Sequence, residues 1–297
     1  MTRTPMIETR VIEGFHQVPF ARFASGYTSR SSAHDATMTS IGATFDGIPA
    51  GLAVVRHAKG EKSASLESIF VDPSGRRKGI GRELIRAAGE RLVGAGALKI
   101  VGSWYHDAPS AVSIELFLNA MGWSLKEAMA TVHRGSRDLL VHLDRNSRAL
   151  RLRPGFEMAD WSTLTPEDHR HMTGLQETQD INVGLHPEGE PMLEVSARTS
   201  VVLRDRGEVA GWMLHHVLGP DLLRYSSLWI RPELGGKGLG IGLAIESSRR
   251  HLAVVDRIPR FFFLVEKGND PMHRFIARRL APAIDRSSTL MRSERSL

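Results

Sequence analysis

The sequence contains no cysteine. Its 297 residues therefore form no disulfide, offer no thiolate to zinc and hold no cysteine nucleophile for an acyl-enzyme. No uninterrupted apolar run reaches the roughly 18 residues that a membrane-spanning helix needs. Residues 1–10 also lack the apolar core of a signal peptide. We expect a cytoplasmic protein with no membrane partner.

Positive charge is in excess, but it is not concentrated. The formal net charge is +6 and 24% of the residues are charged, as in an ordinary globular protein. No five consecutive residues are Lys or Arg, and no helix-turn-helix, zinc-finger or RNP pattern accompanies the charge. This disfavours a nucleic acid partner and leaves a polyanionic cofactor as the simpler reason for a basic chain.

The motifs of two common enzyme classes are missing as well. No Gly-x-Ser-x-Gly elbow marks a hydrolase serine, and no His-x-x-x-His pair marks a zinc site. His215 and His216 are adjacent in a predicted strand, where neighbouring side chains point to opposite faces. We therefore expect no bound metal.

One pattern occurs twice, in residues 71–84 and 230–243. In each copy a strand ends close to a proline, a short glycine-rich loop with basic residues follows, and an amphipathic helix begins. Gly79 aligns with Gly238, and Gly81 with Gly240. A repeated site of this kind predicts a duplicated domain.

The segments around the two loops follow one another in the same order. Apolar runs flank Asp46-Gly47 in the first half and residues 205–208 in the second half, as in β-hairpins. The apolar patterns predict strands at 65–71, 98–104, 123–133, 139–143, 222–230 and 260–265, and helices at 81–93, 110–121, 240–254 and 271–280, with another starting at Pro166. We therefore expect two domains, residues 1–146 and 147–297, joined by the basic segment 145–153.

Both loops suit a pyrophosphate. A helix that begins directly after a strand leaves its first amide N–H groups unpaired, and such groups bind anions. Glycines let the backbone approach phosphate oxygens closely. A Walker A loop is excluded because neither Lys78 nor Lys237 is followed by Ser or Thr. A dinucleotide fingerprint is disfavoured because Leu84 and Leu243 stand where its third glycine belongs.

Residues 76–81 match the pattern Arg/Gln-x-x-Gly-x-Gly/Ala, which resembles the acetyl-CoA-binding motif of the GNAT acyltransferase superfamily. In the second copy Gly235 stands where the family has Arg or Gln, while Gly238 and Gly240 match. The resemblance covers residues of about 6–144 and 152–297, nearly the whole chain. It implies an α/β (mixed α+β) fold of two GNAT-like modules, each a mixed, centrally splayed β-sheet flanked by helices.

The resemblance also implies a function. We expect transfer of an acyl group from acetyl-CoA, or another acyl-CoA, to a small-molecule amine that attacks the thioester directly. The implied catalytic candidates are Glu67 as the base, with Tyr105 and His106 at the amine site. The implied cofactor-binding residues are Ile69, Phe70, Val71, Arg76, Arg77, Lys78, Gly79, Ile80, Gly81, Arg82, Ile230, Gly235, Gly236, Lys237, Gly238, Leu239, Gly240 and Asn269.

The chain departs from the family at the general acid. The family's tyrosine would fall at Leu118 in the first module and at Ile276 in the second, so neither module keeps it. Ser226 takes the place of Glu67 in the second copy. A non-catalytic acyl-CoA-binding or interaction protein with degenerate modules therefore stays open as the alternative. A solvated or salt-bridged strand glutamate likewise stays open for Glu67.

The first copy has the more complete loop and the carboxylate, so we expect the N-terminal module to be the catalytic one. Two modules that pack as a pseudo-dimer would make the protein a monomer or a weak homodimer.

Overall fold

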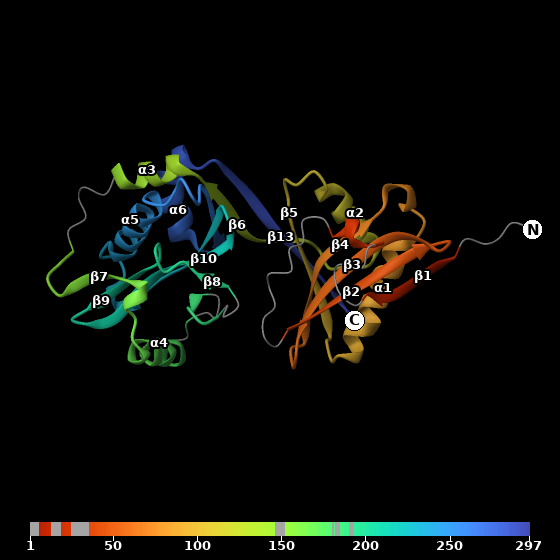
Figure 1. Cartoon of the computed structure of the whole chain (residues 1–297), viewed down its shortest axis with the longest axis horizontal. Helices are drawn as coiled ribbons and strands as arrows, with labels where there is room; N and C mark the ends of the chain where they lie inside the picture. The colour runs from red at the N-terminus through yellow and green to blue at the C-terminus, as the bar shows by residue number, and fades with distance from the viewer. Residues whose placement is uncertain are drawn as a thin grey trace, which may run out of the picture. The chain divides into compact units, whose positions relative to one another are not determined.

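The computed structural model describes residues 6–12, 19–24, 36–145, 152–179, 181, 185–189 and 193–297. The chain divides into two compact units, which Figure 1 shows by their labelled elements. The first unit consists of Met1–Met129 together with Thr289–Leu297, and the second unit of Ala130–Ser288. The predicted domain boundary between residues 146 and 147 lies outside the described residues.

The described part of the first unit is built on one mixed sheet. Its strands, in spatial order, are β1 (Ile7–Ile12), β2 (Ala36–Phe45), β3 (Ile48–Ala58), β4 (Ser63–Val71), β5 (Lys99–Tyr105) and β13 (Arg286–Ser296). Only β4 and β5 run parallel, and the other neighbours in this order are antiparallel. Its helices are η1 (Ala21–Phe23), η2 (Pro73–Gly75), α1 (Ile80–Gly94) and α2 (Ala111–Ala120).

The described part of the second unit repeats this arrangement. Its strands, in spatial order, are β6 (Glu127–Gly135), β12 (Arg260–Glu266), β11 (Leu222–Ile230), β10 (Glu208–Gly219), β9 (Val201–Asp205) and β7 (Phe156–Asp160), with β8 (Glu194–Val195) beside β10. Again only one pair in this order, β11 with β12, is parallel. Its helices are α3 (Arg137–Arg145), η4 (Trp161–Thr163), α4 (Pro166–Gln179), η6 (Pro232–Leu234), α5 (Leu239–Leu252), α6 (Asp270–Arg279) and η7 (Ala281–Ala283).

Each unit completes its sheet with a strand that is distant in sequence. The residues of β13 from Leu290 to Ser296 pair with β5 in the first unit. The residues of β6 from Ala130 to Gly135 pair with β12 in the second unit. Each half of the sequence thus supplies the last strand of the other half's sheet.

Both predicted hairpins are confirmed, and their turns explain why. Asp46 and Gly47 have positive φ values of 51° and 82°, and Arg206 and Gly207 have values of 53° and 93°. Two successive residues with positive φ form the turn whose twist matches that of the flanking strands. The turns join β2 to β3 and β9 to β10.

The predicted strand at 139–143 is wrong, because these residues lie in α3. Leu139, Leu140 and Leu143 are buried in the core of the second unit. Their spacing of one and four residues fits one face of a helix, and Asp138 in the first turn favours the helix dipole. A short apolar run of this kind does not distinguish a strand from a helix by itself.

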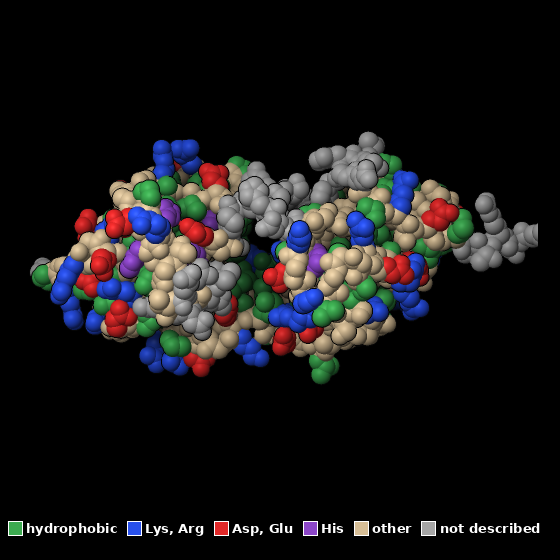
Figure 2. Space-filling model, turned by 90° about the horizontal axis from the view of Figure 1, so that it is seen from below, with side chains coloured by type: hydrophobic (Ala, Val, Ile, Leu, Met, Phe, Trp, Pro, Cys, Tyr) green, Lys and Arg blue, Asp and Glu red, His purple; other side chains and the backbone are tan. Residues whose placement is uncertain are grey.

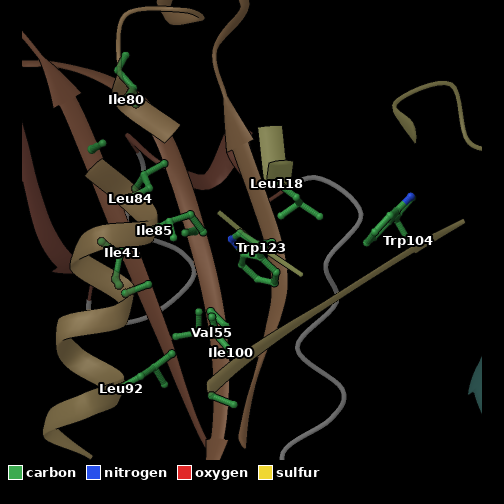
Figure 3. Close-up of a cluster of buried hydrophobic side chains, with 14 of the residues drawn as sticks. Ile41, Val55, Ile80, Leu84, Ile85, Leu92, Ile100, Trp104, Leu118 and Trp123 are labelled. Atoms are coloured by element: carbon green, nitrogen blue, oxygen red, sulfur yellow. The ribbon is translucent and has the colours of Figure 1, made fainter. Parts of the chain in front are cut away.

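Helices α1 and α2 pack on one face of the first sheet. Ile80, Leu84, Ile85 and Leu92 line the inner side of α1 and contact a cluster that includes Trp123 (Figure 3). In the second unit, α3, α5 and α6 contribute to one such core. Helix α4 packs on the opposite face of that sheet, over a separate cluster (Figure 1). The split centre of each sheet, described next, therefore borders a helical layer.

Candidate functional site

The central parallel strands of each unit part before they end. The last pair between β4 and β5 is Leu66–Gly102, although both strands continue. The last pair between β11 and β12 is Tyr225–Phe263, and these strands also continue. Each sheet is therefore splayed at its centre, as predicted.

A β-bulge lies one residue beyond the last parallel pair in both units. On β4 the register with β3 skips Glu67, and on β11 the register with β10 skips Ser226. A bulge interrupts the ladder and bends its strand, which accounts for the separation of the strands at this point. Glu67 and Ser226 therefore occupy equivalent places, as the alignment of the two copies predicts.

The loops that follow the two strands have nearly the same backbone. Arg76 and Gly235 are both extended, with φ/ψ of −63°/151° and −56°/153°. Gly79 and Gly238 cap the following helices in the left-handed conformation, with φ of 88° and 78°. A glycine is needed at this cap because a side chain there is strained.

The two loops differ in backbone strain at one position. Arg77 has a φ of 61°, and Gly236, its counterpart, has a φ of 73°. The left-handed conformation costs a residue with a side chain roughly 1–2 kcal/mol, whereas glycine adopts it freely. Strain of this kind is typical of functional sites. The first loop thus has a strained arginine at the position where the second loop has an unstrained glycine.

The first loop presents free amide donors. Within the described part of the chain, the backbone N–H groups of residues 77–82 donate no hydrogen bond, and the first helical bond runs from Glu83 to Gly79. Arg76, Arg77, Lys78 and Arg82 lie in the same short stretch and are all exposed. Free amides at a helix N-terminus, together with nearby positive charge, are features that favour an anion.

Two of these basic side chains are held by the first unit itself. Arg76 donates from Nε to the carbonyl oxygen of Val71 at 3.2 Å. The Lys78 ammonium lies 4.7 Å from the centre of the Phe45 ring, a cation–π contact. At the three positions equivalent to residues 76–78 the second loop has one basic residue, Lys237, which donates to the Glu233 carbonyl at 3.1 Å. The second loop therefore carries less positive charge at these positions.

Glu67, the predicted base, is paired with a cation. Its Oε1 accepts from Nε of Arg56 at 2.8 Å, and the carboxylate is about one-fifth exposed, at 21%. Its second oxygen, Oε2, accepts no hydrogen bond from the described residues. The ion pair holds the carboxylate beside the split while leaving one oxygen open.

The two other predicted catalytic residues diverge in direction. Tyr105 ends β5 and alternates with Trp104, which points into the core beneath α2. Tyr105 therefore points to the opposite face of the sheet, the face of Glu67. His106 lies beyond the strand, with Nδ1 3.7 Å from Oε1 of Glu115 on α2. The structure thus places Tyr105 on the same face of the sheet as Glu67, and His106 beside Glu115 of α2.

The predicted cofactor residues of β4 are available through their backbone. Ile69 and Val71 pack against the core beneath α1 and α2. Phe70 points to the other face and stacks on Phe23, with ring centres 5.6 Å apart. Beyond Leu66, the edge of β4 that faces β5 has no strand partner in the described residues. Backbone donors and acceptors on this edge are therefore open to an extended ligand.

Several other predicted cofactor residues have structural roles. Ile80 and Leu239 begin α1 and α5 and are buried in the two cores, and Ile230 packs against the second core. The side chain of Asn269 accepts from the Met272 amide at 3.2 Å and caps α6. In this structure their side chains serve core packing and helix capping.

Residues at the positions of the absent general acid are buried. Leu118 and Ile276 each have only 4% of their surface exposed and belong to the two cores. Tyr225, the last paired residue before the second split, is buried, and burial raises its pKa. The Tyr225 ring stacks between His215 and Phe261. Tyr225 is thus a core residue of the second unit.

A buried polar network adjoins the second split. His215 bonds through Nδ1 to Thr199 at 2.9 Å and through Nε2 to Ser247 at 2.8 Å. The hydroxyl of Tyr225 lies 2.9 Å from Nδ1 of His251. Desolvation lowers the pKa of His215, and it lowers the pKa of His251 as well. Both rings are therefore neutral at neutral pH.

Sequence reasoning missed a charged group on the last two strands of the first sheet. Lys99 of β5 and Arg292 of β13 both donate to Glu294. The residues come together because β13 pairs with β5, a contact between distant parts of the chain. No local signal in the sequence reports this pairing.

The charge distribution elsewhere is mixed. On the face shown in Figure 2, Lys and Arg side chains are interspersed with Asp and Glu side chains. Among the described residues, no group of three or more His, Asp or Glu side chains could hold a metal ion. No helix in the same residues is long and apolar enough to cross a membrane.

Comparison with known proteins agrees with this geometry. Residues 8–123 match the model of the family described as Acetyltransferase (GNAT) family. No curated protein sequence matches the chain.

Solved structures match both units together. A tandem GNAT protein from the clavulanic acid biosynthesis pathway superposes with a TM-score of 0.74 at 16% identity, covering 98% of each chain. A GCN5-related glucosamine N-acetyltransferase region of a fungal multi-domain GH3 β-N-acetylglucosaminidase matches with a TM-score of 0.66 at 14% identity, covering 98% of this chain and 38% of that one. A GCN5-related N-acetyltransferase from Sphaerobacter thermophilus reaches 0.57 at 15% identity, covering 86% of this chain and 80% of that one.

Proposed function

Because the chain has the fold of tandem GNAT proteins and its residues 8–123 match the GNAT acetyltransferase family, we propose that it is an N-acyltransferase. It transfers an acetyl group from acetyl-CoA to a small-molecule amine, which attacks the thioester directly. The first unit carries the working site. The observation that carries this proposal is the first loop, where free amides, a strained arginine and three further exposed basic residues lie within residues 76–82.

The residues of the first unit fit this co-substrate. When bound, acetyl-CoA supplies the activated acetyl thioester. The amides of residues 77–82, with Arg76 and Arg77 beside them, would hold its pyrophosphate. The open edge of β4 beyond Leu66 offers backbone groups for the pantetheine arm. The second loop has the same backbone but lacks the arginines, which supports a lesser role for it.

Glu67 is the base in this proposal. Arg56 fixes one of its oxygens, and the other is open to take a proton from the amine, directly or through a water molecule. Tyr105 lies on the same face across the split and lines the acceptor site. Replacement of Glu67 by Gln should lower kcat by about 100-fold or more and leave the affinity for acetyl-CoA unchanged. An unchanged kcat would remove Glu67 from this role.

Thiol release from acetyl-CoA in the presence of a panel of small amines tests the proposed function. We expect wild-type protein to release thiol with some of these amines. Gly81→Glu should lower kcat/KM by roughly 100-fold or more. A carboxylate at the start of the helix repels the phosphates of acetyl-CoA, and the hydrogen bonds from the backbone amides to these phosphates are then lost.

Gly81→Ala is the matched control for crowding. A Cβ atom at this position would lie 3.0 Å from Cε2 of Phe117, so the alanine alone measures how well the ring can yield. The proposal requires Glu to be far more damaging than Ala. Binding of acetyl-CoA without thiol release for any amine would instead support the alternative, a non-catalytic acyl-CoA-binding protein.

A further inference from the structure

The charged group on β5 and β13 has one positive charge in excess. Glu294 accepts from Nζ of Lys99 at 2.9 Å and from a terminal nitrogen of Arg292 at 2.8 Å. Two cations thus share one carboxylate. The acyl transfer described above uses none of these three side chains, so the group calls for its own explanation.

This group lies on the face of the sheet that carries Glu67. Trp104 of β5 points into the core beneath α2, so Ser103 points to the opposite face. Arg292 stands directly opposite Ser103 in the antiparallel register and leaves the sheet on that same face. Arg56, the partner of Glu67, alternates with core residues of β3 and lies on this face as well.

Arg292 has unused binding capacity. Its side chain is about one-third exposed, at 31%, and its Nε is buried without a hydrogen-bond partner in the described residues. A buried N–H group without a partner is uncommon in folded proteins and calls for a ligand group, a water molecule or strain. Glu294 occupies only one terminal nitrogen of the fork.

The spacing suits a small bifunctional acceptor. Strands β4, β5 and β13 are consecutive, and Arg292 is paired with Ser103, one residue beyond the last β4–β5 pair. Arg292 and Glu67 therefore lie across the split, at least two strand spacings or about 10 Å apart. An amine beside Glu67 would therefore bring a nearby acidic substituent toward Arg292.

We propose that the acceptor of the first unit carries a carboxylate besides its amine, and that Arg292 binds this carboxylate through the terminal guanidinium nitrogen that Glu294 does not occupy. The inference rests on the proposed acyl transfer and names the class of its acceptor: amino acids and related amino-carboxylates. Lys99 balances Glu294 so that the guanidinium of Arg292 remains attractive to an anion.

The test compares α-amino acids with their carboxamides as acceptors in thiol release, for wild-type protein and Arg292→Gln. Wild-type kcat/KM should favour the amino acid over its own carboxamide, and Arg292→Gln should reduce this ratio by about 10- to 100-fold, the value of a charge-assisted pair. Arg86→Gln is the matched control. It removes the same charge from an exposed ion pair on α1 and should leave the ratio unchanged.

A second readout does not depend on turnover. With CoA present, calorimetry should show N-acetyl amino acids binding more tightly than their carboxamides in wild-type protein, with the difference lost in Arg292→Gln. Equal or absent binding of both compounds overturns the inference, as does a carboxylate preference that survives in Arg292→Gln. Failure of the proposed function is distinct from these outcomes, since it would abolish acetyl-CoA binding or thiol release for every amine.

Discussion

The loops of the two units follow the same path and carry different side chains. Their backbone angles agree within about ten degrees at the extended position and at the helix cap. Both follow a bulge and a pair of parted parallel strands. The first loop has three consecutive basic residues, and the second has two glycines and one lysine in the same places. The bulge residue is Glu67 in the first unit and Ser226 in the second.

This difference separates what makes the fold from what makes the site. Glycine caps, turn residues and apolar alternation set the backbone, and both units keep them. The side chains that would bind phosphate or move a proton contribute little to that backbone, so one unit can lose them without unfolding. The second unit has instead filled the region beside its split with a buried histidine network. The proposed function accordingly assigns the working site to the first unit.

Removal of residues 289–297 should have the largest effect on stability, and it should destabilise the first unit alone. Residues 290–296 pair with β5, and Met291 is buried in the first core. Losing one buried Met alone costs about 2–5 kcal/mol, against a typical domain stability of about 5–15 kcal/mol. Calorimetric unfolding should lose the transition of the first unit, and acetyl-CoA binding should disappear.

Removal of Leu297 alone is the control for this truncation. Leu297 is exposed at 36% and should be dispensable. If hydrogen exchange showed α1 equally protected with and without residues 289–297, the strand that the second half of the sequence supplies would not matter for the stability of the first unit.

Making the first loop resemble the second should be the next largest effect. The double variant Arg76→Gly/Arg77→Gly should raise the Kd for acetyl-CoA by about 10- to 100-fold, because charge-assisted bonds to phosphate are lost. The Arg77→Gly change should not lower the melting temperature, because glycine adopts the positive φ at position 77 without strain. An unchanged Kd would show that the side chains of this loop are irrelevant to binding.

Mild acid should destabilise the second unit more than the first, because of the buried histidines of the second unit. Desolvation lowers the pKa of His215, His216 and His251 in the folded second unit. The unfolded chain then binds more protons than the folded one below its ordinary pKa of about 6.5, so stability is full above this pH and declines below it. Each histidine that stays neutral costs about 1.4 kcal/mol per pH unit in this range.

Hydrogen exchange corrected for its intrinsic pH dependence measures this effect. Protection of α5 should fall between pH 7 and pH 5, whereas protection of α1 should change less. Equal losses in both helices would contradict a special acid sensitivity of the second unit.

The parts of the fold that the sequence predicts correctly are those with local signals. The Asp46-Gly47 turn fixes a hairpin, and Gly79 and Gly238 fix the loop-to-helix junctions within a few residues of chain. The splay of the sheets followed from the resemblance that these loops carry. Such features depend on neighbouring residues, which sequence patterns describe well.

The remaining features depend on contacts between distant residues. Lys99 and Glu294 are 195 positions apart, and only the pairing of β13 with β5 brings them together. Apolar residues at 139–143 fit a strand or a helix, and packing against α5 and η7 accompanies the helix. Tyr225 adjoins the second split but is buried, because its ring stacks on His215 of the neighbouring strand. Burial of this kind is a property of the assembled core.

Calorimetric titration of acetyl-CoA into wild-type protein, Gly81→Glu and Gly240→Glu tests the central claim most directly. A Cβ atom at Gly240 has no neighbour closer than 3.9 Å, so Gly240→Glu is less crowded than Gly81→Glu, and Gly81→Ala controls for this difference. The account predicts one strong site per chain, lost in Gly81→Glu and kept in Gly240→Glu. A site lost only in Gly240→Glu, or two equal sites in wild-type protein, would contradict it.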